Sequence, residues 1–236
     1  MTDFSQNNNK QSGNILIYIL GAIFLLGLLI VTIRGSNTSS SGVTEENMMI
    51  RISEIQQYGA ELENSIAFIL QKGFSETEIK FSHPDADPNY GLISDNPERQ
   101  VFHRDGGAAT YRKAPKEIQS TPTQWLFNAQ NNIPLVGSTN NSNSNNDVEL
   151  IAFLPNVTKQ FCVTLNEKLG ITNPSNSPPN DNGGVEFSAE FNGSFDMSET
   201  IGDSGNLLDG KTEGCFEGGG SPPSGTYHYY RALLIR

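Results

Sequence analysis

The sequence predicts an α+β protein: an N-terminal hydrophobic helix, an amphipathic helix, and then a strand-rich antiparallel domain with a short helix. The chain has 236 residues, of which 36% are hydrophobic, so it can bury a sizeable core. Gly (23 residues) and Asn (25 residues) are abundant, whereas charged residues make up only 17% of the chain. This composition favours turns and loops over a helical bundle.

The charge balance bears on the class of partner. There are 15 Lys and Arg residues against 26 Asp and Glu residues, which gives a formal net charge of -11. A protein that binds nucleic acid by neutralising phosphates needs the opposite balance. We therefore expect no nucleic-acid partner.

A hydrophobic segment near the N-terminus predicts one membrane span. Residues 15–33 carry no charge, and the charged residues Lys10 and Arg34 flank them. As a helix this stretch would be about 28 Å long, close to the hydrocarbon thickness of a bilayer, and it exceeds the apolar core of a secretory signal. The alternative is a long cleavable signal peptide. The predicted organisation is a polar leader-like segment over 1–13, a transmembrane helix over 14–34, a flexible linker over 35–43 and an α+β domain over 44–236.

An amphipathic helix is predicted directly after the linker. Thr44 is a suitable N-cap and Gly73 a natural C-terminal stop. Gly59 occupies a gap in the apolar stripe. The stripe itself has helical spacing and predicts packing on a sheet or on other helices, and it consists of Ile52, Ile55, Leu62, Ile66 and Ile69.

The remainder predicts short strands and loops. Residues 78–81, 125–127, 148–154, 185–191 and 226–235 have strand-like patterns. Pro155 is expected to end the strand over 148–154. Asn156 or Thr158 can then cap a short helix that ends before Gly170. Residues 137–147 and 173–184 have the composition of solvent loops.

The two cysteines, Cys162 and Cys215, leave one disulfide or two free thiols as the realistic choices. If the domain lies outside the cytoplasm, a disulfide would join the short helix to the terminal strand pair. Such a closure contributes about 4 kcal/mol in the loop-entropy model.

Asp85, Asp87 and Asn89 alternate as the ligands of a calcium loop do, but the sequence departs from that pattern afterwards. The glycine of the sharp turn arrives late, at Gly91, and Asn96 stands where the bidentate Glu is expected. A loop with side-chain-capped turns is the alternative to a calcium site. No two of the three histidines have the helical spacing that metal ligands show. These histidines are His83, His103 and His228.

Two short matches to catalytic motifs are isolated. Residues 202–205 spell GDSG, which would make Ser204 a nucleophile, but no histidine has the sequence context of a serine protease. Residues 103–105 spell HRD without the other kinase motifs. A polar turn is the preferred interpretation of the first match, and neither predicts an enzyme or a cofactor.

The order of elements is similar to that of type IV pilin-like proteins and the pseudopilins of type II secretion. Residues 12–18 (SGNILIY) resemble a prepilin peptidase site, with cleavage between Gly13 and Asn14. Major pilins commonly carry Glu at the fifth mature position, where this chain has Tyr18, and tip-type minor pseudopilins are similar in lacking that Glu. The segments over 154–171, 214–219 and 227–236 resemble a group of bacterial pilin-like proteins.

The resemblance implies a function and an orientation. It implies a non-enzymatic, single-pass protein of the bacterial inner membrane, with the leader in the cytoplasm and the C-terminal domain in the periplasm or at the cell surface. This orientation agrees with a disulfide between the two cysteines. The implied partners are the membrane, other pilin-like subunits and a prepilin peptidase. The competing hypothesis is a membrane-anchored periplasmic binding or adhesion domain that never polymerises.

Overall fold

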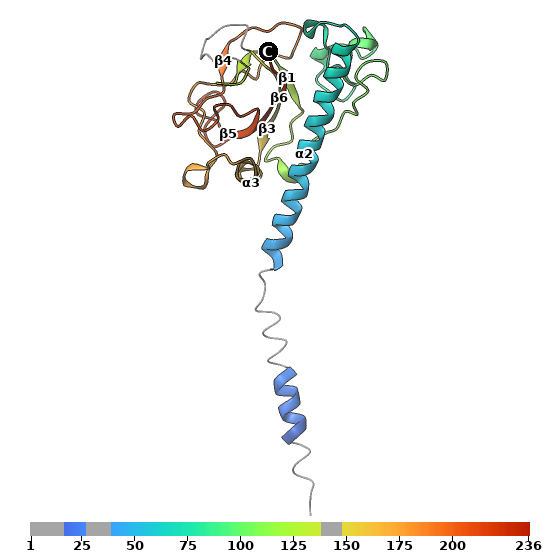
Figure 1. Ribbon diagram of the computed structural model, residues 1–236. Helices are drawn as coiled ribbons and strands as arrows, with labels where there is room; N and C mark the ends of the chain where they lie inside the picture. Colours follow the sequence, from blue (N-terminus) through green and yellow to red (C-terminus); the bar gives the residue numbers. More distant parts are fainter. Residues whose placement is uncertain (1–16, 27–38, 138–147) are drawn as a thin grey trace, which may run out of the picture. The chain divides into compact units, whose positions relative to one another are not determined.

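The computed structural model describes residues 17–26, 39–137 and 148–236, and it has an α+β fold with an antiparallel sheet and one disulfide. The chain divides into two units, residues 1–47 and 48–236. In the first unit, residues 17–26 are helical (Figure 1). Most of the predicted transmembrane helix over 14–34 lies outside the described residues. Among the helices that are described, none combines the length and the apolar character needed to cross a membrane.

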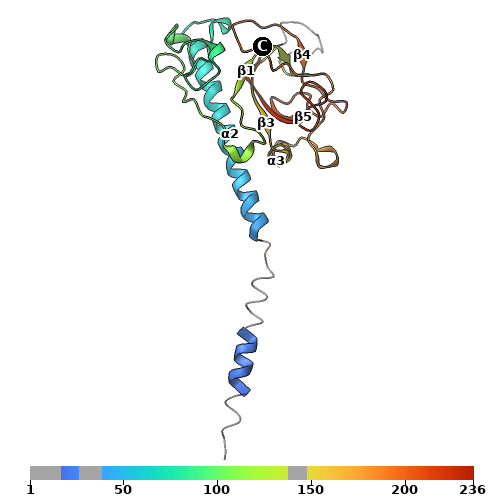
Figure 2. The ribbon, with the colours of Figure 1, turned by 180° about the vertical axis from the view of Figure 1, so that it is seen from behind.

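A four-stranded antiparallel sheet is the centre of the second unit. It contains β1 (Leu126–Asn128), β3 (Leu150–Val157), β6 (Tyr227–Leu234) and β5 (Glu213–Glu217), in the order β1-β3-β6-β5. Both views show α2 (Ser39–Gln71) running beside this sheet (Figures 1 and 2). The terminal strand predicted over 226–235 is thus confirmed as β6, a central strand, and the strand predicted over 125–127 corresponds to β1.

The two faces of the sheet bury different hydrophobic clusters, because side chains alternate along each strand. On β6, Tyr229 and Leu233 belong to the cluster that includes α2, and Tyr230 and Ala232 belong to a second cluster. We call these the helix-side core and the far-side core. Loop residues complete the far-side core, namely Ile133, Val136, Ile171, Val185, Ile201 and Leu208.

The amphipathic stripe of α2 is confirmed. The five predicted apolar side chains are at most 3% exposed, and all lie in the helix-side core. The helix begins at Ser39, within the linker predicted over 35–43, so the predicted start at Thr44 is wrong. Extending a helix that has already formed costs little at each residue, even through serines and a glycine.

The short helix α3 (Lys159–Leu169) follows the predicted signals. Thr158 is its N-cap, and the side chain of Thr158 accepts a hydrogen bond from the backbone N–H of Phe161. Gly170 ends the helix in the left-handed conformation, with φ at 68°. Phe161, Cys162 and Leu165 are buried against the sheet.

Pro155 lies within β3, so the prediction that it ends the strand is wrong. The pairing between β3 and β6 shifts register between Leu154 and Val157, and Asn156 has a positive φ of 56°. This irregularity lets the chain continue to Val157 without a backbone donor at Pro155.

The strands predicted over 78–81 and 185–191 are also wrong. Lys80 forms one isolated bridge with Gln100, and residues 185–191 are irregular. Val185 and Phe191 are nevertheless buried, because loops supply part of each core. β2 (Asn131–Asn132) and β4 (Glu199–Thr200) form a small parallel pair. The single-turn 3-10 helices are η1 (Glu76–Glu78), η2 (Pro88–Tyr90), η3 (Pro97–Arg99), η4 (Lys116–Ile118) and η6 (Pro174–Asn176).

Candidate functional site: the junction and open groove of helix α2

An arginine of the central strand joins α2 to the sheet. The guanidinium of Arg231 donates to the carboxylate of Glu63 on α2 at 2.6 Å and to that of Glu213 on β5 at 3.3 Å. It also donates to the backbone carbonyl of Gln56 at 3.3 Å. A Cβ at Gly59 would collide with the Arg231 side chain, so the gap in the apolar stripe of α2 is the space that this side chain occupies.

The electrostatics of this junction keep Arg231 charged. Burial alone would lower its pKa, but the hydrogen bond that Arg231 donates to Glu63 and the nearby Tyr229 and Glu213 raise the pKa above its ordinary value. The Tyr229 hydroxyl donates to Glu213 at 3.0 Å, and burial raises the pKa of Tyr229 well above its usual range. The junction is a hydrogen-bonded network in which one guanidinium bridges two carboxylates, and this suits a permanent structural contact better than a reaction.

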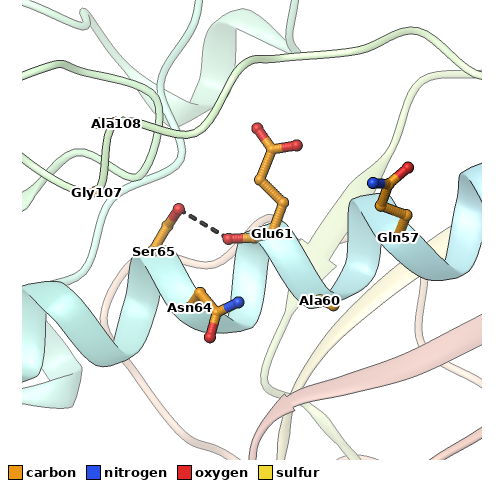
Figure 3. A pocket seen from close by; sticks show the side chains of 7 residues that line it. All are labelled: Gln57, Ala60, Glu61, Asn64, Ser65, Gly107 and Ala108. Carbon is orange, nitrogen blue, oxygen red and sulfur yellow. Dashed lines mark hydrogen bonds between the residues drawn. The ribbon is translucent and has the colours of Figure 1, made fainter.

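The opposite side of α2 is open and borders two pockets. The larger pocket, about 480 Å³, lies between α2 and the loop at Gly107 and Ala108. Figure 3 shows its lining, with Glu61 and Ser65 on the helix; the Ser65 hydroxyl donates to the Glu61 carbonyl at 2.8 Å. The smaller pocket, about 340 Å³, is lined by Glu54, Ile55, Gln57, Tyr58, Arg112, Lys113, Ala114, Pro115 and Trp125.

An ion pair connects the helix to the loop that borders both pockets. Arg112 donates to the Glu61 carboxylate at 2.5 Å, and the other oxygen of that carboxylate accepts the Thr110 N–H at 2.8 Å. Gln57 lines both pockets. We call this continuous surface, from Glu54 to Ser65 on α2 and from 107 to 115 on the loop, the α2 groove.

One buried polar atom borders the α2 groove. The indole N–H of Trp125 has no hydrogen-bond partner among the described residues, although Trp125 is only 3% exposed. Its ring packs edge-on against Tyr58 of α2, with centroids 5.3 Å apart, and against Tyr229 of β6, with centroids 6.0 Å apart. Trp125 therefore connects the groove to the helix-side core.

The structure brings the two cysteines together. Cys162 of α3 and Cys215 of β5 form the disulfide, with their Cα atoms 5.2 Å apart. Both are fully buried, so the disulfide is part of the core. Of the two choices left open by the sequence, the structure has the disulfide.

The predicted processing site, Gly13 and Asn14, lies outside the described residues. Its assignment remains a prediction from the sequence.

The side chains of Asp85, Asp87 and Asn89 have separate partners. Asp85 pairs with Lys113 at 2.9 Å, and the hydrogen bond and charge of that lysine lower the pKa of Asp85. Asp87 caps η2 by accepting the Asn89 N–H at 2.9 Å. The Asn89 side chain donates to Glu190 at 3.2 Å. Within the described parts of the chain, no group of three or more His, Cys, Asp or Glu side chains is arranged to hold a metal ion.

The GDSG segment is a turn held by its aspartate. The carboxylate of Asp203 accepts the backbone N–H groups of Gly205 and Leu207 at 2.8 Å and that of Leu208 at 3.2 Å. All of these bonds serve the local loop, which supports the polar-turn interpretation of Ser204.

The three histidines lie in different settings. The Nδ1 atoms of His83 and His103 each accept a backbone N–H two residues later, from Asp85 and Asp105. His228 is 2% exposed and packs on Phe216, with ring centroids 5.3 Å apart. Burial lowers the pKa of His228 to about 4.

Sequence reasoning missed the junction and the groove. Arg231 interrupts an apolar terminal strand and Gly59 interrupts an apolar helix stripe, so both were visible as exceptions. Their pairing depends on contacts about 170 residues apart in the chain, as the Arg231–Glu63 separation of 168 shows.

Comparisons with known protein families, curated proteins and solved structures give no match. The geometry and the sequence signature therefore carry the functional argument.

Proposed function

We propose that this chain is a single-pass, membrane-anchored, pilin-like structural protein of a bacterial envelope, acting in a filament or secretion pseudopilus as a minor or tip subunit. The observation that carries the proposal is the junction of α2. From Ile52 to Ile69, α2 packs one face into the core of a disulfide-closed domain, and the opposite side borders the α2 groove.

This division of the helix suits a structural subunit. The Arg231 network joins α2 to the sheet through ionic hydrogen bonds of 2.6 and 3.3 Å, and a well-packed core deforms little under load. The hydrophobic segment over 15–33 supplies the anchor in this proposal, and apolar helices of that kind pack side by side.

The first experiment determines the N-terminus of the membrane-extracted protein, by intact mass or N-terminal sequencing, with and without an active prepilin peptidase. Peptidase-dependent loss of residues 1–13 is expected. A Gly13→Leu variant should stay full length in the presence of the peptidase. A full-length N-terminus in the unmodified chain, with an active peptidase, would refute the processing step and with it the pilin-like pathway.

A second experiment tests assembly. Both cysteines of the chain are in the disulfide, so one added cysteine is a unique thiol. Gln57→Cys places it in the α2 groove, and Gln160→Cys places it on the exposed start of α3 as a control. Thiol crosslinking in membranes should give crosslinked species of higher molecular weight that contain this chain for Gln57→Cys, and few such species for Gln160→Cys.

The competing function is a membrane-anchored periplasmic binding or adhesion domain. The α2 groove is an open polar surface, lined by Gln57, Glu61 and Asn64, which suits a macromolecular or polymeric ligand of an adhesion domain better than an enclosed small molecule. An intact N-terminus together with uncrosslinked Gln57→Cys protein would favour this function over a polymerising one.

A further inference from the structure

The sequence contains two Asn-Gly dipeptides, Asn192-Gly193 and Asn182-Gly183. Asparagine amides react with the peptide nitrogen of the following residue, and a following glycine permits this because it has no Cβ to shield that nitrogen and few conformational limits. Both asparagines are exposed, so solvent access does not distinguish the two sites. The hydrogen bonds around the two dipeptides do distinguish them.

At Asn192 the reacting atoms are free and oriented. The side-chain oxygen of Asn192 accepts the backbone N–H of Ser194 at 3.0 Å, which folds the amide over its own backbone and polarises its carbonyl carbon. No described residue accepts a hydrogen bond from the Gly193 N–H. Gly193 has a positive φ of 102°, and a Cβ there would collide with the Thr77 carbonyl, so the packing requires glycine.

At Asn182 the corresponding atoms are engaged. The amide of Gly183 faces the buried carboxylate of Asp181, which also accepts the N–H groups of Gly184 at 2.8 Å and Gly202 at 3.1 Å. The Asn182 N–H donates to the Gly202 carbonyl at 3.0 Å. The Gly183 nitrogen therefore has an interaction with a carboxylate that the Gly193 nitrogen lacks, and we expect its attack on the asparagine side chain to be slower.

We propose that Asn192 is a site of spontaneous covalent modification, in which the chain converts this asparagine to aspartate and isoaspartate. The Gly193 nitrogen loses its proton and bonds to Cγ of Asn192, while the bond from Cγ to Nδ2 breaks and ammonia leaves with that proton. Water then opens the cyclic imide. Attack at the side-chain carbonyl gives aspartate, and attack at the backbone carbonyl gives isoaspartate, with no oxidant or reductant required.

The site lies between two anchors. The Phe191 N–H donates to the Phe127 carbonyl of β1 at 2.7 Å, and the Asp196 N–H donates to the Ala129 carbonyl at 3.1 Å. Isoaspartate adds one backbone methylene between these anchors. Phe191 and Phe195 are both buried on either side of the dipeptide, so the modification loosens the packing of this segment.

The test is peptide mapping of the folded full-length chain in detergent, incubated at pH 8 and sampled over time. Mass spectrometry measures deamidation at each dipeptide, and methylation by an isoaspartyl methyltransferase identifies isoaspartate. Deamidation at Asn192 is expected to be several-fold faster than at Asn182. In urea-unfolded protein the two rates should converge, because the hydrogen bonds that distinguish them are lost.

Two variants complete the design. Asn192→Ala should abolish enzymatic methylation of the peptide that contains residue 192, while the rate of deamidation at Asn182 stays unchanged. Gln160→Ala, on the exposed start of α3, controls for handling. The proposal is overturned if folded protein deamidates at Asn182 as fast as at Asn192, or if the Asn192 peptide of the folded chain stays unmodified while that of unfolded chain reacts.

Discussion

At the scale of single residues, Gly59 sets how closely α2 approaches β6. The side chain of Arg231 fills the space that a Cβ would take, and its hydrogen bonds to Glu63 and Glu213 depend on that position. A helix interior ordinarily disfavours glycine by about 1 kcal/mol relative to alanine. Here the close contact outweighs that preference.

Gly59→Ala is therefore expected to destabilise the domain. Overpacking and displacement of Arg231 should exceed the gain in helix propensity, for a net loss of about 1 kcal/mol or more. The loss of stability is measured by urea titration, with circular dichroism as the signal of unfolding. Gly220→Ala is the matched control, since a Cβ there meets nothing within 4 Å. A Gly59→Ala variant more stable than the unmodified protein would contradict this account of the junction.

His228 makes stability depend on acid. Its folded pKa is lowered to about 4 by burial, from an ordinary value of 6.5. Between pH 4 and pH 6.5 the His228 side chain is protonated in the unfolded chain but not in the folded chain. The contribution of neutral His228 to the free energy of unfolding is therefore fully present above pH 6.5, and it declines as the pH falls toward 4. The contribution lost is about 3 kcal/mol.

The measurement is the free energy of unfolding between pH 7 and pH 4. His228→Gln should show a shallower decline than the unmodified protein, and His103→Gln, in a half-exposed turn, should follow the unmodified protein. The comparison uses the slopes, so a general loss of stability in the His228 variant does not affect it. Equal slopes in all three proteins would remove His228 as the acid-sensitive group.

At the scale of elements, the contact between α2 and the sheet combines apolar packing with one ionic network. The Arg231–Glu213 pair of the network is shielded, with 16% of the Arg231 side chain and 11% of the Glu213 side chain exposed, whereas 36% of the Glu63 side chain is exposed. The pair Arg51–Glu54 on the same helix is much more exposed, at 37% and 47%. Shielded networks are costly to break because a charge is left without its partner.

Arg231→Met should lower the free energy of unfolding by about 2 kcal/mol, since Glu213 would remain buried without its cation. Arg51→Met, at an exposed pair, should leave the unfolding midpoint nearly unchanged. Urea titrations of both variants under identical conditions give the comparison. If the two variants lose equal stability, the network does not join the elements as described.

The elements that the sequence predicted correctly have local signals. The stripe of α2 repeats with helical spacing, and α3 has Thr158 and Gly170 as its two caps. Both depend on neighbouring residues alone. The polar turn at Ser204 was predictable for the same reason, because the Asp203 carboxylate accepts the N–H groups of residues that follow it.

The elements that were predicted wrongly depend on tertiary contacts. Pro155 remains in β3 because β6 pairs on both sides of the irregularity, which no local pattern reveals. Residues 185–191 alternate like a strand but form no ladder with the sheet, although the Phe191 N–H donates to the Phe127 carbonyl of β1. The α2 groove likewise depends on the 107–115 loop, whose approach to Glu61 is fixed by Arg112.

At the scale of the whole molecule, the boundary between the two units falls within α2, at Asn47 and Met48. Residues from Met48 onward form the second unit, and Ile52 and Ile55 are the first side chains of α2 that are buried in its core. We therefore expect the second unit to contain all the information for its own fold, including both cysteines of the disulfide.

A fragment of residues 48–236 should fold and show a cooperative thermal transition close to that of the full chain in detergent. A fragment of residues 57–236 is the matched control, because it removes Ile52, Ile55 and the Gln56 contacts with Arg231 and Glu213. Loss of two buried isoleucines costs several kcal/mol, about 2–5 kcal/mol for each large side chain removed from a core. Differential scanning calorimetry on both fragments, with thiol labelling to verify the disulfide, provides the readout. Equal transition temperatures for the two fragments would show that the first turns of α2 are not part of the core, and the junction would then begin at Gly59.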